Sequence, residues 1–292
     1  MFEGFEQRQI TTGGTTINLV KGGDGPPLLL LHGYPQTHVM WHKIAPRLSE
    51  DFTVVVADLR GYGDSGKPHG DPQHLNYSKR AMAQDMIEVM QQLGYESFLL
   101  VGHDRGARVS HRLAKDHSQR VQRMALLDII PTHRMFKIVN KEMATNTYHW
   151  FFLIQPYDFP ERMIGAAADY FIRSRFERGK DPAKVFPPAA VAEYVRCGRE
   201  PAAIHGMCED YRAGASIDLV HDEADFDNKV TCPLFLLWSS TGYVGRTQDV
   251  LGVWREYATD VRGQSLPCGH HLPEEMPDET YAVLRPFLLE QG

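Results

Sequence analysis

Short apolar runs alternate along the chain with longer segments in which apolar and polar residues follow a helical spacing. Most of the later apolar runs are unbroken, as in parallel strands that helices cover on both faces. The alternation of strand and helix patterns predicts an α/β protein. The predicted strands span residues 5–10, 16–20, 27–32, 53–58, 98–104, 124–128, 234–238 and 262–266.

The pattern changes between residues 128 and 233. This stretch has no convincing strand, and it is rich in aromatic residues ("YHWFFLIQPYDFPERMI") and in helix-like sequence ("PAAVAEYVRCG"). Because strand-like runs return afterwards, we interpret it as a helical cap inserted into the core rather than as a second independent domain. The predicted boundaries are 1–132 for the first part of the core, 133–225 for the cap and 226–292 for the second part of the core.

Composition limits the possible partners. The chain has 292 residues, 42% of them hydrophobic and 23% charged, which is ordinary for a globular protein with one large domain. The net charge of -6 and the lack of a basic run argue against binding nucleic acid or an anionic membrane. The N-terminal residues lack the apolar core of a secretion signal, and no apolar run approaches the roughly 18 residues of a membrane span. We therefore expect a cytoplasmic protein.

Cysteine usage gives no sign of a metal site. The four cysteines are scattered without CxxC spacing, which favours reduced, structural thiols and predicts no bound metal. They are Cys197, Cys208, Cys232 and Cys268.

The stretch "LLVGHDRGARVSHRLA" begins as a buried strand and continues as a helix. Gly102 and Gly106 flank Asp104 at the junction. Small residues on either side of one residue are typical of a nucleophile elbow, a strained turn that exposes a reactive side chain above the sheet. A GxDxG string alone is weak evidence, but its place between a strand and a helix makes Asp104 the predicted nucleophile.

Other segments supply the groups that such an elbow needs. A strand ends at "HGYP". We expect a backbone N–H near Tyr34 and the backbone N–H of Arg105 to stabilise together the negative charge that develops in the reaction. Asp128 follows the strand "ALLDII", whereas "LLWSSTGYVG" after the next strand has no carboxylate, so Asp128 is the predicted acid. Whether residues 239–245 alter the pocket is left open.

The late segment "CGHH" offers two histidines, and we choose His270 because it directly follows the glycine. His271 is then a packing or surface residue. Asp104, Asp128 and His270 then follow the chain order nucleophile, acid, histidine. This arrangement resembles the α/β-hydrolase fold, which implies a mostly parallel eight-stranded sheet flanked by helices.

An aspartate nucleophile attacks a saturated carbon and forms an alkyl ester, which water activated by a histidine then hydrolyses. Carbon–halogen bonds and epoxides both suit this chemistry. Arg105 and Arg108 begin the helix, where cations oppose the helix dipole at about 0.3 to 1 kcal/mol each. We therefore expect both to bind a substrate carboxylate, whereas Arg112 fits an exposed helix face.

The motifs "GHDRGAR", "LLDIIPT", "YHWFF", "CEDYRAGASID" and "CGHHLPEE" resemble those of the fluoroacetate (haloacetate) dehalogenases, and the resemblance extends over nearly the whole chain. It implies hydrolysis of a small 2-haloacid to the 2-hydroxyacid and halide, with no cofactor, by a homodimer. The resemblance also implies roles for particular residues. The catalytic residues would be Asp104, Asp128 and His270, and the substrate carboxylate would be bound by Arg105 and Arg108. The donors to the departing halide would be His149, Trp150 and Tyr211.

Two alternatives stay open from the sequence. An epoxide hydrolase would use Tyr148 or Tyr211 to open the ring, but the arginine pair would have no evident task with a neutral epoxide. A non-catalytic protein that binds a small carboxylic acid would keep the arginines. From the residues alone, His149 and Trp150 also fit a cap core, and Tyr211 a surface network.

Overall fold

The computed structural model describes residues 1–177 and 181–290. An eight-stranded sheet forms its centre, in the order β1-β2-β4-β3-β5-β6-β7-β8. The strands are β1 (Glu6–Thr11), β2 (Thr16–Gly22), β3 (Pro27–Leu31), β4 (Thr53–Ala57), β5 (Phe98–His103), β6 (Val121–Leu127), β7 (Leu234–Ser239) and β8 (Val261–Leu266). Two pairs, β1 with β2 and β2 with β4, are antiparallel, and the other neighbours are parallel. The eight predicted strands and the mostly parallel sheet are confirmed.

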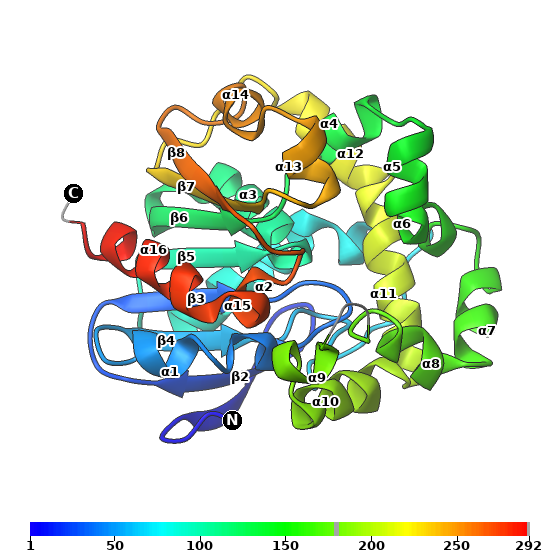
Figure 1. The fold of residues 1–292 in the computed structure, drawn as a ribbon, viewed down its shortest axis with the longest axis horizontal. Coiled ribbons are helices and arrows are strands. Elements are labelled where there is room, and N and C mark those ends of the chain that lie inside the picture. Colours follow the sequence, from blue (N-terminus) through cyan, green and yellow to red (C-terminus); the bar gives the residue numbers. More distant parts are fainter. Residues whose placement is uncertain (178–180, 291–292) are drawn as a thin grey trace.

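Helices cover both faces of this sheet. Those outside the segment between β6 and β7 are α1 (Ala45–Leu48), α2 (Lys79–Gln92), α3 (Arg105–Asp116), α13 (Tyr243–Thr247), α14 (Val250–Arg255), α15 (Leu272–Glu275) and α16 (Pro277–Leu289). Figure 1 shows α1, α15 and α16 in front of the sheet and α2 and α3 behind it. Short 3₁₀ turns lie at His38–Trp41, Leu75–Tyr77 and Ser118–Arg120.

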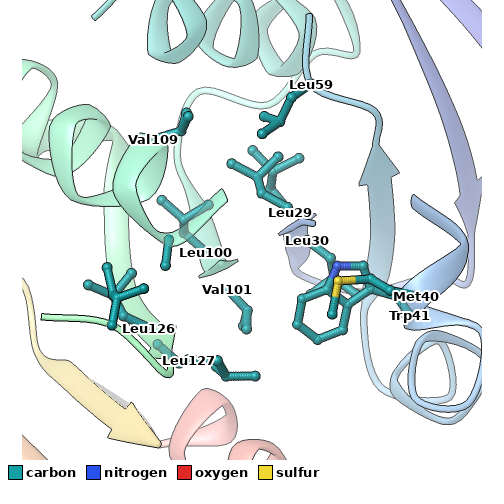
Figure 2. Close-up of a cluster of buried hydrophobic side chains, with 14 of the residues drawn as sticks. Leu29, Leu30, Met40, Trp41, Leu59, Leu100, Val101, Val109, Leu126 and Leu127 are labelled. Carbon is teal, nitrogen blue, oxygen red and sulfur yellow. The ribbon is translucent and has the colours of Figure 1, made fainter. Parts of the chain in front are cut away.

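The core forms because the central strands are apolar on both faces. The strands β3 and β4 read "PLLLL" and "TVVVA", and their leucine and valine side chains have no exposed surface. Branched aliphatic side chains of this kind favour buried parallel strands. Figure 2 shows the two faces of the sheet, with Leu30, Val101 and Leu127 beside Met40 and Trp41 on one, and Leu29, Leu100 and Leu126 beside Leu59 and Val109 on the other.

The described residues between β6 and β7 form the helices expected of a cap. They are α4 (Thr132–Lys137), α5 (Lys141–Asn146), α6 (Tyr148–Leu153), α7 (Phe159–Gly165), α8 (Ala168–Arg173), α9 (Pro182–Val185), α10 (Pro188–Gly198), α11 (Pro201–Gly214) and α12 (Ile217–Ala224). In Figure 1 the helices α5 to α11 gather at one end of the sheet. The boundaries at 132/133 and 225/226 stay a prediction.

One arginine lies elsewhere than the sequence predicts. Arg112 was expected on an exposed helix face, but its side chain is 3% exposed. It pairs with Asp116 of its own helix at 2.7 Å and with Asp222 of α12 at 3.6 Å, and it also contacts Asp225. The expectation was wrong because α12 and the residues after it cover this face of α3.

Within the described part of the chain, no helix combines the length and the apolar character that crossing a membrane requires.

Candidate active site

Asp104 stands alone between β5 and α3, and its backbone is strained. Its φ of +46° and ψ of -111° lie in a region that non-glycine residues rarely occupy. A methyl carbon built on Gly102 would lie 2.5 Å from Ser110 Oγ, and one on Gly106 would lie 2.4 Å from the carbonyl oxygen of His32. Both neighbours must therefore be glycine for the helix to approach the sheet, and the predicted elbow geometry is present.

The carboxylate of Asp104 is buried and held ionised. The residue is only 6% exposed, and the N–H of Tyr34 donates to its Oδ2 at 3.0 Å. Burial opposes ionisation, but the positive charges of His270, Arg105 and Arg108 outweigh it and lower the pKa of Asp104 to about 2. Because Tyr34 occupies Oδ2, the other oxygen, Oδ1, is the one available to attack.

The second predicted backbone donor is the N–H of Arg105. It is the first amide of α3, so it has no partner within the helix. Its part in holding negative charge stays a prediction.

His270 and Asp128 form a close pair beside this carboxylate. The His270 Nδ1 lies 2.6 Å from Asp128 Oδ2, and the other oxygen of Asp128 accepts the N–H of Ser239 at 2.8 Å. Burial disfavours the imidazolium, but the hydrogen bond and charge of Asp128, together with the charge of Asp104, raise the pKa of His270 to about 9. The pair therefore fixes one ring nitrogen and leaves Nε2 for chemistry.

His271 has different surroundings. Its Nδ1 lies 3.2 Å from Gln36 Oε1, and its ring centroid lies 5.6 Å from that of Phe176 and 5.2 Å from that of Phe186. The structure thus brings His270 to Asp128 and packs His271 against aromatic side chains, as the sequence predicted.

Arg108 lines the cavity above Asp104. Its Nη1 donates to the carbonyl of Ile130 at 3.1 Å and to Thr132 Oγ1 at 2.9 Å, and its Nε has no partner among the described residues. Burial, with the nearby charge of Arg105, lowers the pKa of Arg108 to about 10, so it stays a cation at neutral pH. This guanidinium has no carboxylate partner among the described residues and can hold an anion.

Arg105 was predicted to bind the substrate carboxylate, and the structure shows that most of its guanidinium is engaged with a cap residue. Its guanidinium is 1% exposed and bonds Asp210 of α11 at 2.8 Å through both Nε and Nη2. Burial opposes the charge of Asp210, but Arg105 and Lys79 hold the pKa of that carboxyl well below its usual range. Only Nη1 of Arg105 is not engaged with Asp210. Sequence reasoning missed Asp210 because the contact joins residues far apart in the chain.

The predicted halide donors come together on the cap side. His149 and Trp150 of α6 line the cavity, and the Tyr211 ring centroid lies 5.8 Å from that of His149 and 6.0 Å from that of Trp150. The hydroxyl of Tyr211 and Nδ1 of His149 are buried without a partner among the described residues. Burial and the charge of Arg175 lower the pKa of His149 to about 3, so it is neutral. These polar atoms are available to a small ligand.

The cavity measures about 260 Å³ and has walls that the sequence did not reveal. Gly242, Tyr243 and Val244 line it, so the segment 239–245 does shape the pocket. Arg175 also lines it, and nothing distinguished this residue from the other basic residues of "RSRFER".

The described residues hold one grouping with metal-ligand spacing, and it lies outside this cavity. Ligand atoms of Asp64, Glu193 and Cys197 come within 4.8 Å of one another. Arg196 contacts both carboxylates at 2.7 Å, so the grouping is an ion-pair cluster.

Comparison with known proteins agrees with this geometry. Residues 26–275 match the family model for the alpha/beta hydrolase fold. A fluoroacetate dehalogenase from Burkholderia sp is 49% identical over 99% of this chain and 95% of its own length. The chain belongs to the fluoroacetate dehalogenase family of the α/β-hydrolase fold. The resemblance predicted from the motifs is therefore confirmed, and the protein is a hydrolase.

Two further members of the α/β-hydrolase fold show how widely this scaffold is used. The crystal structure of a proposed α/β hydrolase from Nostoc sp PCC 7120 is 60% identical, covers 100% of both chains and superposes with a TM-score of 0.97. A soluble epoxide hydrolase from Corynebacterium sp. (strain C12) is 34% identical over 92% of both chains. The fluoroacetate dehalogenase family thus shares its fold with epoxide hydrolases, and the cavity must decide between the two activities.

Proposed function

We propose that this protein hydrolyses the carbon–halogen bond of small 2-haloacids, converting fluoroacetate or chloroacetate to glycolate and halide. The observation that carries the proposal is the cavity itself, where the ionised carboxylate of Asp104 shares one space with the unpaired guanidinium of Arg108. A nucleophilic carboxylate repels an anionic substrate, and a nearby cation offsets that repulsion. The 49% identity to a fluoroacetate dehalogenase supports the same reaction.

Arg108 and Arg105 act together in binding the substrate carboxylate. At 4 Å, two like charges repel by about 4 kcal/mol at an effective dielectric of about 20, enough to weaken binding about a thousandfold. Arg108 offers Nε and Nη2 to the carboxylate, because Ile130 and Thr132 already hold its Nη1. Arg105 contributes its Nη1, the one guanidinium nitrogen that Asp210 does not engage. Asp210 therefore positions Arg105 for binding the carboxylate.

The first half-reaction is a displacement at the carbon that bears the halogen. Asp104 Oδ1 forms a bond to this carbon while the halide departs with the bonding electron pair, and no proton moves. Tyr34 N–H keeps the other carboxylate oxygen in place and faces the carbonyl oxygen of the ester that forms. For a chiral 2-haloacid this single displacement inverts the centre.

Donors on the cap side stabilise the leaving halide. Fluoride is small and strongly hydrated, so its departure among buried side chains needs replacement hydrogen bonds. The Tyr211 hydroxyl, the Trp150 indole N–H and a ring N–H of neutral His149 supply them. The Tyr211 hydroxyl and His149 Nδ1 have no hydrogen-bond partner among the described residues, which fits donors kept for the transition state.

The second half-reaction hydrolyses the ester. His270 takes a proton from water, the hydroxide attacks the Asp104 carbonyl carbon, and the acyl–oxygen bond breaks. The departing alkoxide takes the proton held by His270 to give the 2-hydroxyacid, and the second proton of the water is released as the Asp104 carboxylate forms again. Ester formation removes the charge of Asp104, which is one of the causes that raise the pKa of His270. The alkylated state therefore favours the neutral imidazole that the step requires.

Halide release tests the proposal directly. We expect the purified protein to release halide from fluoroacetate and chloroacetate, and Asp104→Asn to release none. Release of chloride alone would keep the mechanism but show that the cap donors stabilise fluoride poorly. Carboxylate binding without any halide release would favour the alternative of a non-catalytic binding protein.

Epoxide hydrolysis is the second candidate, because the free hydroxyl of Tyr211 suits ring opening and an epoxide hydrolase shares this fold. Arg108 argues against it, since a neutral epoxide leaves this buried cation without a partner. Turnover of styrene oxide without haloacid activity would favour this candidate.

We also propose that the protein is a homodimer located in the cytoplasm. Several apolar side chains of the cap are exposed, among them Tyr157 at 67% and Tyr170 at 77%, and an interface between two copies would cover such side chains. Sedimentation at increasing protein concentration tests the assembly, and a monomer throughout would contradict it.

A further inference from the structure

Arg175 is a cation of the cavity wall that the mechanism above does not use. It follows α8 and lines the same cavity as Asp104 and Arg108. Its guanidinium carbon lies 5.1 Å from the ring centroid of Tyr148, 5.2 Å from that of Phe171 and 5.8 Å from that of Tyr34. Its Nε and Nη2 are buried and have no hydrogen-bond partner among the described residues.

Arg175 is part-buried as a residue, and two of its N–H groups are cut off from solvent. Contacts with aromatic faces offset part of the loss of hydration, but buried N–H groups of a cation still need acceptors. Within the described residues no carboxylate pairs with Arg175, whereas Asp210 pairs with Arg105 at 2.8 Å. The unpaired charge is therefore available to an anion in the cavity.

Charge moves across this cavity during the displacement. Before it, one negative charge lies on Asp104, next to His270 and the elbow arginines. After it, the same charge lies on the halide beside His149, Trp150 and Tyr211. All three donors are neutral, because burial lowers the pKa of His149 to about 3 and, with Asp104, raises that of Tyr211 well above its usual value.

Arg175 lies near His149, one of the donors proposed to receive this charge. The Tyr34 ring, which the guanidinium contacts, lies parallel to His149 at a centroid distance of 5.6 Å and an interplanar angle of 8°. Its charge is also close enough to disfavour protonation of His149. Arg105 lies 4.1 Å from the Tyr211 ring, but Asp210 balances its charge.

We propose that Arg175 provides the positive charge that stabilises the halide as the carbon–halogen bond breaks. The inference rests on the proposed dehalogenation. The bond from Asp104 Oδ1 to carbon forms, the carbon–halogen bond breaks, the electron pair leaves with the halide, and no proton is transferred. Arg175 acts through the field it adds to the neutral donors, so its contribution grows with the charge concentrated on the leaving atom.

A leaving-group series separates this role from substrate binding. Single-turnover halide release is measured from fluoroacetate, chloroacetate and bromoacetate with Arg175→Gln and Arg175→Lys. We expect Arg175→Gln to slow fluoride release on the order of tenfold or more and bromide release least, with KM nearly unchanged. Arg175→Lys restores most of the rate because it keeps the charge. Arg162→Gln is the matched control, since Arg162 lies on the cap surface with its side chain 80% exposed.

Two outcomes of this series overturn the inference. An equal rise in KM for all three acids, without dependence on the leaving group, would mean that Arg175 holds the substrate carboxylate. Unchanged kinetics in a folded Arg175→Gln variant would mean that its charge does not act on the reaction.

Bromide binding provides a readout that does not depend on turnover. Bromide added to the protein without substrate quenches tryptophan fluorescence, and we expect weaker binding in Arg175→Gln than in Arg175→Lys. Equal bromide affinity in Arg175→Gln and Arg175→Lys would overturn the inference. If the unmodified protein releases no halide but its bromide binding depends on Arg175, the proposed function fails while the halide site stands.

Discussion

The two sides of the cavity are built on opposite principles. On the sheet side, charged groups are held by specific partners: Asp104 by Tyr34 N–H, and His270 by Asp128. On the cap side, the polar atoms of His149 and Tyr211 are buried without partners in the described structure. Side chains held by fixed partners keep the nucleophile and the base in one geometry before the reaction starts. Donors without a partner can instead bind the halide, whose negative charge appears only during the reaction. This difference fits the proposed mechanism, in which the sheet side performs the bond making and the cap side receives the leaving group.

The largest effect is expected from removing the sheet-side base. His270→Gln should leave the displacement intact and slow ester hydrolysis by about 10² to 10⁴-fold. One equivalent of halide would then be released per active site, and the ester mass would remain on the peptide that contains Asp104. Mass spectrometry of the digested protein measures this, with His271→Gln as the neighbouring control. Steady halide release in His270→Gln at the normal rate would contradict the role of this histidine.

The second largest effect is expected from breaking the ion pair between Arg105 and Asp210, which links the two sides of the cavity. Asp210→Asn leaves Arg105 buried without its counter-charge, and disrupting a buried pair in this way costs about 3 to 5 kcal/mol of unfolding free energy. Urea unfolding measures the loss. We also expect KM for chloroacetate to rise, because Arg105 no longer holds its position beside Arg108. Unchanged stability would show that water or another group replaces Asp210.

A smaller effect is expected on the cap side, where one donor is lost. Tyr211→Phe should slow fluoride release by about 10² to 10³-fold and chloride release by less, because chloride needs less stabilisation. Unfolding free energy should hardly change, since the lost hydroxyl has no partner in the described structure. Tyr170→Phe is the control, because Tyr170 lies on the cap surface and is 77% exposed. An equal loss for both halides would contradict a role in holding the leaving atom.

The smallest expected effect is a shift in titration. The pKa of His270 is about 9 in the free protein, partly because of the charge of Asp104. Removing that charge in Asp104→Asn destabilises the imidazolium, so NMR titration should give a lower pKa. When ester hydrolysis limits turnover, kcat should rise with pH through a value below 9, because Asp104 is neutral in the ester. An unshifted pKa would show that Asp128 alone sets it.

The sequence predicted what local pattern determines. Unbroken runs such as "LLLL" and "VVV" have few alternatives to buried strands, and glycines at positions 102 and 106, between a strand and a helix, indicate the elbow. It did not predict what depends on partners distant in the chain. Arg105 and Arg112 look like free cations until α11 and α12 bring their carboxylates to them. Arg175 shows the opposite case. Its sequence context gives no sign of a functional role, and only the folded structure shows that it lines the cavity.

The most direct test of the mechanism is a single turnover of chloroacetate in heavy-oxygen water, with excess protein over substrate. An ester on Asp104 places the heavy oxygen first in the Asp104 carboxylate, so the peptide that contains Asp104 should gain mass while the first glycolate formed carries ordinary oxygen. Label that enters glycolate directly and never Asp104 would mean that water attacks the substrate carbon itself, and the account of the elbow as a nucleophile would be wrong.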